Sequence, residues 1–326
     1  MILGIDATNL RGGGTRTHLI ETLSAVESIK HPFKKIFVWG STETLAHLPT
    51  SRILIKKNPP ALNKGLLSRT LWQKFRLSET ARENGCDILF VPGGAYLGDF
   101  HPVVTMSRNM LPFQMGEAFR YGASIYLLKL LLLRNVQKKS FKNSDGLIFL
   151  TDFAKNLVLR TAGNLNAELR IISHGLSSDF FHPPKEQKDI TAFDEKNPFN
   201  IIYVSRVEPY KHQEEVVRAV LELRKKNDWP LTLDLFGPSN KKYLSYLAAL
   251  IDKIDPSGSW VRYNGEVSHK DLPSIYSNAC LGVFASSCEN LPNILIEMMG
   301  SGLPIACSSK GPMPEVLGNG GVYFDP

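Results

Sequence analysis

The sequence predicts an α/β protein made of two doubly wound, Rossmann-like domains, each a parallel sheet covered by helices on both faces. A chain of 326 residues is long enough for two separate cores. Short β-branched or apolar runs alternate with helical patterns along most of the chain. Residues 179–200 are polar, rich in proline and without sustained periodicity, as an interdomain linker is. We therefore predict one domain over residues 1–182 and a second over 183–326, facing each other across a cleft.

Each predicted strand is a short apolar run that ends near a glycine or proline turn. Those of the first domain are residues 1–6, 34–40, 51–57, 87–94, 102–107, 146–151 and 168–175. Those of the second are residues 200–206, 231–237, 260–265, 281–286 and 304–309. Between them, residues 17–29 and 213–226 carry apolar side chains at helical spacing. Since ligands of such folds bind beyond the carboxyl ends of the strands, the loops that follow strands are the expected site.

Charge is divided unevenly between the two predicted domains. Up to His182 there are 23 lysines and arginines against 13 aspartates and glutamates, a net charge of +10, whereas the remainder carries 15 against 18, or −3. A basic first half indicates anionic partners, such as phosphorylated substrates or a membrane surface. Nucleic acid is not expected as a partner, because no basic motif with interleaved aromatic residues appears.

The most apolar segment, residues 125–136, is interrupted by Lys129 and is too short to span a bilayer. We expect it to form a buried helix. A helix lying on a membrane surface is the alternative, because the basic residues that follow, up to Lys142, suit weak association with anionic lipid.

The cysteines and the N-terminus bear on the compartment. Cys86, Cys280, Cys288 and Cys307 show no C-x-x-C pattern and no metal-ligand spacing with the histidines, which indicates a reduced setting without a zinc site. The first residues have no basic leader followed by an apolar core, so no signal peptide is expected. These observations predict a cytoplasmic protein.

A glycine-rich loop follows the first predicted strand, which ends at Asp6. Gly12, Gly13 and Gly14 stand just before a helix, where backbone amides can approach an anion without obstruction by Cβ atoms. The loop lacks the G-x-G-x-x-G pattern of dinucleotide-binding proteins. A tight turn with a purely structural role is the alternative.

The second domain opens with a strand that ends at Ser205 and is followed by two cations. Arg206 and Lys211 stand five residues apart at the start of a helix. A guanidinium fork and an ammonium group at this spacing can both reach a diphosphate. Two solvated surface cations are the alternative interpretation.

Two glutamates follow the strand predicted at residues 281–286. Glu289 precedes a helix that has a proline in its first turn, and Glu297 lies about two turns further on. The amides of Leu291 and Asn293, in the exposed first turn, can donate to a ligand. Carboxylates accept hydrogen bonds from vicinal hydroxyls, so this pair suits a sugar and a ribose. An acid that complements the helix dipole would explain Glu289, but not Glu297 among its apolar neighbours.

Together these motifs resemble the retaining glycosyltransferases of family 4, which have the GT-B fold. The resemblance is carried by Arg206-x4-Lys211, by Glu289-x7-Glu297 followed by Gly-Leu-Pro, and by the glycine-rich loop. A turn at residues 172–181 also matches, although it has His174 where the family usually has asparagine. The resemblance covers essentially the whole chain.

The resemblance implies a role for each motif. Arg206 and Lys211 would bind the donor diphosphate and stabilise the leaving group, and Glu289 would contact the donor sugar. The remaining substrate contacts would come from Glu297 for the ribose, Val267 for the base, Gly12, Gly13 and Gly14 for the diphosphate, and Asn290, Leu291 and Asn293 in place of the family's usual Gly-Phe-Gly. Asn109 is a candidate in residues 107–112, where the family often has a His-Asp pair.

The implied activity is that of a retaining hexosyltransferase. It would move a sugar from a nucleotide-sugar donor to a glycan or polyprenyl-linked acceptor in bacterial polysaccharide or lipopolysaccharide (O-antigen) biosynthesis, at the inner face of the membrane. Because no Asp-x-Asp appears, we expect neither a metal ion nor another cofactor. A GT-B nucleotide-sugar 2-epimerase and a non-catalytic nucleotide-sugar-binding protein are the alternatives. Members of the family usually continue into a final helix that crosses back onto the first domain, and this sequence stops before it, so we expect either a truncated form or a second domain that lacks this helix.

Overall fold

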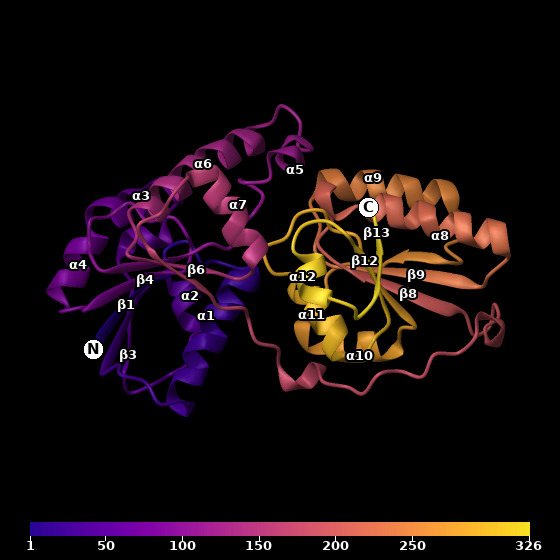
Figure 1. Ribbon diagram of the computed structural model, residues 1–326, viewed down its shortest axis with the longest axis horizontal. Helices are drawn as coiled ribbons and strands as arrows, with labels where there is room; N and C mark the ends of the chain where they lie inside the picture. Colours follow the sequence, from indigo (N-terminus) through magenta and orange to yellow (C-terminus); the bar gives the residue numbers. More distant parts are fainter. The chain divides into compact units, whose positions relative to one another are not determined.

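The computed structural model describes residues 1–326, with Gly13 given only as the first residue of a helix. The chain divides into two compact units, each around its own parallel sheet (Figure 1). Unit 1 comprises Met1–Phe113 and Ile125–His174, and unit 2 comprises Gln114–Ser124 and Gly175–Pro326. The predicted fold class, two Rossmann-like parallel sheets with alternating helices, is confirmed.

Unit 1 contains a seven-stranded sheet in the order β3-β2-β1-β4-β5-β6-β7, and every pair in it is parallel. Its strands are β1 (Ile2–Asp6), β2 (Lys35–Trp39), β3 (Leu54–Lys57), β4 (Ile88–Val91), β5 (Val103–Met106), β6 (Gly146–Phe149) and β7 (Glu168–Ile171). The strand order reverses between β1 and β4. The loops that leave these two strands therefore mark the place where ligands bind in such sheets.

Helices cover both faces of the unit 1 sheet, as Figure 1 shows. They are α1 (Gly13–Ala25), α2 (Thr42–Ala46), α3 (Leu66–Phe75), α4 (Leu77–Glu83), α6 (Ile125–Lys142) and α7 (Asp152–Ala162). Alternate residues of β2 point to opposite faces, so Ile36 and Val38 enter one core cluster and Phe37 and Trp39 another. This two-sided burial explains why the strands read as continuous apolar runs.

Unit 2 contains a six-stranded parallel sheet in the order β10-β9-β8-β11-β12-β13. Its strands are β8 (Phe199–Val204), β9 (Leu231–Phe236), β10 (Val261–Tyr263), β11 (Leu281–Phe284), β12 (Ile305–Ser308) and β13 (Val322–Phe324). Its helices are α5 (Met115–Phe119), α8 (Gln213–Asn227), α9 (Lys241–Ile254), α10 (Leu272–Asn278), α11 (Asn293–Gly300) and α12 (Met313–Leu317). The order reverses between β8 and β11.

The units differ from the predicted domains in two segments. Residues 175–182 pack with unit 2, where the Phe180 side chain is 1% exposed within the core and the amide of His182 donates to the carbonyl of Gly300. Residues 114–124 also belong to unit 2, although the chain on either side of them builds unit 1. The composition of neither segment indicates the unit with which it packs.

The prediction that residues 125–136 form a buried helix is wrong for the first turns of α6. Its buried residues, Leu130, Gln137, Ser140 and Phe141, follow one narrow stripe. Ile125, Tyr126, Leu128 and Leu132 are exposed, at 75%, 45%, 56% and 57%. The run is apolar all round, so periodicity could not indicate which face the protein covers. Among the described residues no helix is both long and apolar enough to span a membrane.

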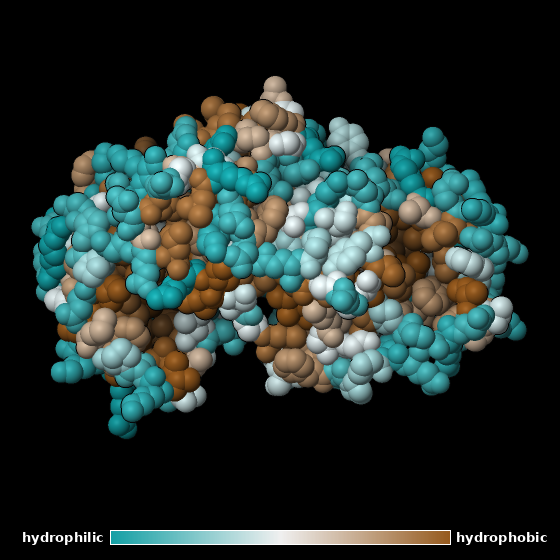
Figure 2. Space-filling model, in the orientation of Figure 1, coloured by the Kyte–Doolittle hydropathy of each residue, from teal (hydrophilic) through white to brown (hydrophobic). Residues whose placement is uncertain are grey.

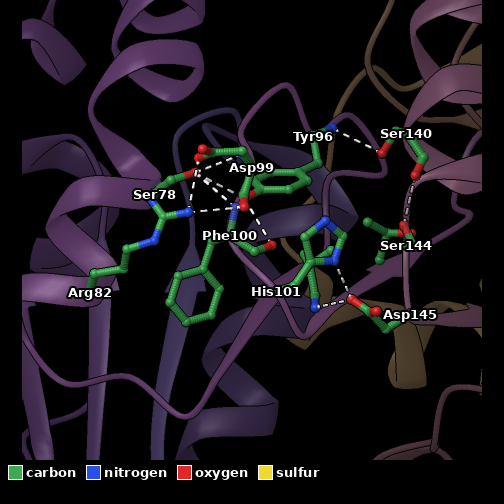
Figure 3. Close-up of polar contacts among 11 residues, drawn as sticks. Ser78, Arg82, Tyr96, Asp99, Phe100, His101, Ser140, Ser144 and Asp145 are labelled. Carbon is green, nitrogen blue, oxygen red and sulfur yellow. Dashed lines mark hydrogen bonds and ion pairs between the residues drawn. The ribbon is translucent and has the colours of Figure 1, made fainter.

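A polar network fixes the loop between β4 and β5 (Figure 3). The hydroxyl of Ser78, at the start of α4, accepts from the amides of Asp99 and Phe100 at 2.9 and 3.1 Å. The amide of Tyr96 donates to Ser140 of α6 at 3.0 Å. Two helices thus hold the loop that leaves β4, the strand next to β1 at the reversal of the sheet.

Candidate functional site

The strand order of unit 2 brings two predicted loops together. The loop after β8 carries Arg206 and Lys211, and the loop after β11 carries Glu289. Because β8 and β11 are neighbours, the Nζ atom of Lys211 forms an ion pair with Oε1 of Glu289. This is the point of strand reversal at which ligand crevices form in parallel sheets.

The ion pair is largely withdrawn from solvent. The Lys211 and Glu289 side chains are 11% and 16% exposed. The ammonium group also lies 5.3 Å from the ring centroid of Tyr210 and 5.4 Å from that of Phe284. Arg206, by contrast, is exposed. An exposed guanidinium thus lies in the same loop as a shielded ammonium, a combination that suits a phosphate group.

A buried tyrosine of β8 forms a hydrogen bond with the loop that carries Lys211. The hydroxyl of Tyr203, in β8, donates to the carbonyl of Lys211 at 2.7 Å. Tyr203 is 1% exposed, and burial raises the pKa of its phenol, so it stays a donor. Sequence reasoning missed this residue, because a tyrosine inside a strand looks like an ordinary core residue.

Asn293 lies in the first turn of α11, as predicted, but Leu291 does not, because it precedes the N-cap residue and lies outside the helix. Asn290 is buried, Leu291 is partly buried, and Asn293 is exposed as the first residue of α11. Pro292 occupies the N-cap position, just before the predicted first-turn position. The first amides of a helix have no partner within it, so those of the first turn of α11, which directly follows the Glu289 loop, are free of intrahelical hydrogen bonds.

Glu297 lies in a buried cluster of its own. Its side chain is 7% exposed, and its oxygens contact Nε2 of His269 at 3.1 Å and the hydroxyl of Tyr276 at 3.2 Å. Burial raises the pKa of Glu297, and the contacts with His269 and Tyr276 oppose this rise. His269 is 59% exposed and links the carboxylate to the surface. Sequence reasoning missed His269 and Tyr276, which precede Glu297 by two loops.

Val267, the predicted base contact, lies in the loop after β10. It is partly buried against the unit 2 core. The start of the loop is held by the amide of Asn264, which donates to Leu235 at 2.8 Å, and by the carbonyl of Gly265, which accepts from Gly237 at 2.7 Å. The main chain of Asn264 and Gly265, two to three residues before Val267, is thus anchored to the end of β9.

In unit 1 the glycine-rich loop leads directly into α1. A Cβ atom added at Gly12 or Gly14 would meet nothing within 4 Å, so the packing of this chain does not require glycine at either position. Gly13 lies outside the described residues apart from its place at the start of α1. Asn109 is exposed, and its side chain accepts from the amide of Leu111 at 3.0 Å. It therefore caps a local turn after β5.

An arginine and two histidines gather beside this loop. Arg108 donates to the carbonyl of Gly14 at 3.0 Å and contacts Nδ1 of His18 at 3.1 Å. The rings of His18 and His174 lie 4.3 Å apart between centroids. Burial lowers the pKa of both imidazoles to about 4, with a further contribution from Arg108, and lowers that of Arg108 to about 10. The histidines are therefore neutral at pH 7. Sequence reasoning missed this cluster, although Arg108, a cation next to the predicted Asn109, could have indicated it.

A pocket of about 350 Å³ adjoins the loop after β8. It lies in unit 2, between residues 120–122 and helices α8 and α9, and Glu208, Tyr243 and Tyr246 line it. None of the predicted site residues does. In the described part of the chain, no three histidine, cysteine, aspartate or glutamate residues are grouped so as to hold a metal ion. The metal-free expectation stays a prediction.

Comparison with known proteins places these features in a family context. Residues 184–326 match the family described as Glycosyl transferases group 1. The chain is similar to the O-antigen chain mannosyltransferase B of Escherichia coli, at 25% identity over 203 residues, which is 60% of this chain and 52% of that protein. The chain spans about half the length, or less, of the curated relatives it matches.

Solved structures share its fold. Sucrose-phosphate synthase from Thermosynechococcus elongatus superposes with a TM-score of 0.72 at 17% identity, over 100% of this chain and 86% of that one. Alr3699/HepE of Anabaena, in complex with UDP-glucose, gives 0.67 at 16% identity, over 100% and 86%. The chain therefore has the GT-B fold, and its residues 184–326 match the family described as Glycosyl transferases group 1.

Proposed function

We propose that the protein is a glycosyltransferase that moves a hexose-type sugar from a nucleotide-sugar donor to a glycan or polyprenyl-linked acceptor. The observation that carries the proposal is the ion pair of Lys211 and Glu289 at the strand reversal of unit 2, with Arg206 in the same loop as Lys211. The family match over the same unit and the similarity to an O-antigen mannosyltransferase support it.

The ion pair suggests how a donor enters this site. Glu289 is the partner of the Lys211 ammonium group. A diphosphate carries more negative charge than a carboxylate and offers several acceptor oxygens, so it competes for Lys211 while Arg206 adds a second contact. The displaced Glu289 carboxylate then accepts hydrogen bonds from hydroxyls of the donor sugar.

The chemical step needs stabilisation of the charge that develops on the departing diphosphate. Arg206, Lys211 and the first-turn amides of α11 supply it. The bond between the anomeric carbon and the phosphate oxygen breaks, the acceptor oxygen bonds to the same face of the sugar, and the leaving phosphate takes the acceptor's proton. Retention of configuration and independence from a metal ion are parts of this proposal.

The acceptor side of the proposal concerns unit 1. The exposed apolar residues at the start of α6, seen as apolar surface where this helix runs in Figure 2, are followed by Lys138, Lys139 and Lys142. Apolar side chains beside lysines suit the surface of an anionic membrane. We include weak association with the cytoplasmic face of a membrane, where polyprenyl-linked acceptors reside, in the proposed function.

Thermal unfolding with UDP-, GDP-, ADP- and TDP-sugars identifies the donor, because a ligand that binds only the folded state raises the melting temperature. The best ligand is then incubated with the protein alone. Slow release of free nucleotide supports transfer, an epimerised sugar supports a 2-epimerase, and binding without turnover supports a non-catalytic protein. A panel without any stabilising nucleotide sugar contradicts the proposal.

Cosedimentation tests the membrane part. The protein is expected to sediment more with vesicles that contain phosphatidylglycerol than with neutral ones, and Leu128→Glu is expected to abolish the difference. Equal sedimentation with both kinds of vesicle removes membrane association without affecting the proposed chemistry.

A further inference from the structure

Residues 114–124 join the fold of unit 2 next to the loop after β8. They leave β5 and return to α6, both in unit 1, yet they pack with unit 2. Tyr121 is 6% exposed, and its ring meets that of Tyr243 edge to face, with 5.9 Å between centroids. The Tyr121 hydroxyl donates to Oε2 of Glu208 at 3.0 Å. The segment is thus anchored to the loop that also carries Lys211.

A second anchor reaches the loop after β11. The hydroxyl of Ser287 donates to Oε2 of Glu117 at 2.7 Å and contacts Nε2 of His212 at 2.9 Å. Two groups that only accept lie near the single hydroxyl proton, the Glu117 carboxylate at 2.7 Å and the carbonyl of Tyr210 at 3.3 Å. The proton goes to the nearer one, Glu117, and either way Nε2 of His212 is the donor to Ser287. The hydrogen bonds therefore run from His212 through Ser287 to Glu117. Since the ring donates to the hydroxyl, it does not activate Ser287 as a nucleophile.

His212 is held in an unfavourable backbone conformation. It has φ 53° and ψ 36°, in the left-handed region that is uncommon for residues other than glycine, although asparagine, aspartate and histidine are enriched there. It directly follows Lys211 and precedes α8, and its side chain is 3% exposed. Such strain persists only where surrounding contacts hold it. The bond to Ser287 is one of these contacts.

The same serine joins the two loops through its backbone. The amide of Ser287 donates to the carbonyl of Tyr210 at 2.9 Å, next to Lys211 in sequence, and Ser287 itself lies two residues before Glu289. The contacts of Ser287 therefore lie beside both members of the ion pair, and one of them comes from Glu117 in the inserted segment.

We propose that Glu117, Ser287 and His212 are positioning residues that set the placement of Lys211 against Glu289. The inference rests on the proposed function for the role of that ion pair. Glu117 bonds to neither Lys211 nor Glu289, but its hydrogen bond orients the Ser287 hydroxyl, which in turn holds the His212 ring. Through these bonds the segment between β5 and α6 supports the donor-side loops.

Two measurements on Ser287→Ala, Glu117→Ala and Glu117→Gln test this. In hydrogen–deuterium exchange of the unliganded chain, both alanine variants should speed exchange of residues 205–213 about fivefold, as expected from one lost hydrogen bond. In turnover with the donor found by the thermal panel, they should lower kcat by about 10- to 100-fold with little change in KM, because misplaced groups lose rate more than binding. Glu117→Gln, which keeps an acceptor oxygen for Ser287, should recover most of both.

Glu215→Ala is the matched control. Its carboxylate lies 4.0 Å from the other ring nitrogen of His212 and is 59% exposed, but has no part in the Ser287 bonds. It should behave as the parent does. Parent-like exchange or parent-like kcat in Ser287→Ala overturns the inference, and so does equal loss in Glu117→Gln and Glu117→Ala. A parent that turns over no nucleotide sugar counts against the proposed function instead, and the exchange measurement still decides whether Ser287 couples the loops.

Discussion

The substitution Glu289→Gln separates a ligand-binding carboxylate from one that only serves a helix. Glu289 is 16% exposed and paired with Lys211, which is 11% exposed. Removing one partner of a fully buried pair costs roughly 3–5 kcal/mol. Here the pair retains some exposure, and the amide oxygen of glutamine still accepts from the ammonium group. We therefore expect a loss of about 1–2 kcal/mol in the free energy of unfolding.

Glu289→Gln should change the affinity for the nucleoside diphosphate and the rate of turnover in different directions. Glutamine no longer neutralises Lys211, so a diphosphate meets less competition, and the affinity for the nucleoside diphosphate should stay equal or rise. Turnover should fall by ~10²–10³-fold, as for one lost transition-state contact. A carboxylate that only complemented the helix dipole would cost a few tenths of a kcal/mol and leave both ligand properties alone.

Three assays on the same preparation decide between these roles. Urea unfolding gives the stability, calorimetry with the nucleoside diphosphate gives the affinity, and release of nucleotide gives the turnover. Glu215→Gln is the control, because the Glu215 carboxylate is exposed in the first turn of α8. Parent-like turnover, or an affinity that falls in proportion to turnover, would refute the reasoning.

Four further results are expected. Arg206→Ala should weaken nucleoside diphosphate binding and turnover together, since the diphosphate is common to ground state and leaving group; unchanged calorimetric affinity contradicts its assignment. Glu297→Gln should weaken the same ligand by roughly 1.5–3 kcal/mol, the worth of a charged hydrogen bond, and an unaltered affinity would leave it a structural residue. Turnover should survive EDTA, and activity that disappears and returns with magnesium contradicts the metal-free mechanism. Asp255 accepts from the amides of Trp260 and Val261 at 2.8 and 3.0 Å; although burial acts to raise its pKa, these bonds lower it to about 2 from 3.8. The ionised Asp255 carboxylate therefore stabilises the fold fully above about pH 4, and this contribution is lost as the pH falls toward 2. Asp255→Asn should lower the free energy of unfolding by about 2 kcal/mol at pH 7 and make it depend less on pH below about 4. An unchanged dependence on acid pH contradicts this assignment.

Local patterns in the amino-acid sequence are enough to predict the layers of both units. Continuous apolar strands, such as the one that ends at Ser205, are visible in sequence because both faces of a parallel sheet are buried. Every predicted strand is present, and only β13 (Val322–Phe324) was missed. Arg206, Lys211 and Glu289 could be singled out because each lies in a loop that follows a strand, at the end of the sheet where ligands bind in such folds.

The sequence could not show which loops meet. Strand order is a non-local property, and only the adjacency of β8 and β11 brings Lys211 to Glu289. The same limit applies to Glu297. It lies about two turns after Glu289 in sequence and was expected to contact the ribose, whereas the fold encloses it with His269 and Tyr276. These two side chains come from the 3-10 helix before α10 and from α10 itself, and nothing near Glu297 in sequence indicates that they contact it.

The sequence also could not show that residues 114–124 belong to unit 2. Residues 114–124 carry no marker of their partner, because Glu117 and Tyr121 would suit any polar, partly buried surface. Only the folded chain places them against Ser287 and Glu208. Likewise Arg108, His18 and His174 come from three separate segments of unit 1 and form a cluster only there. Hydrophobic periodicity is a local property that can be seen in the amino-acid sequence, whereas the pairing of polar groups depends on which segments are neighbours in the folded chain. The sequence by itself therefore determined the layers of this protein, and the tertiary structure determined its polar contacts.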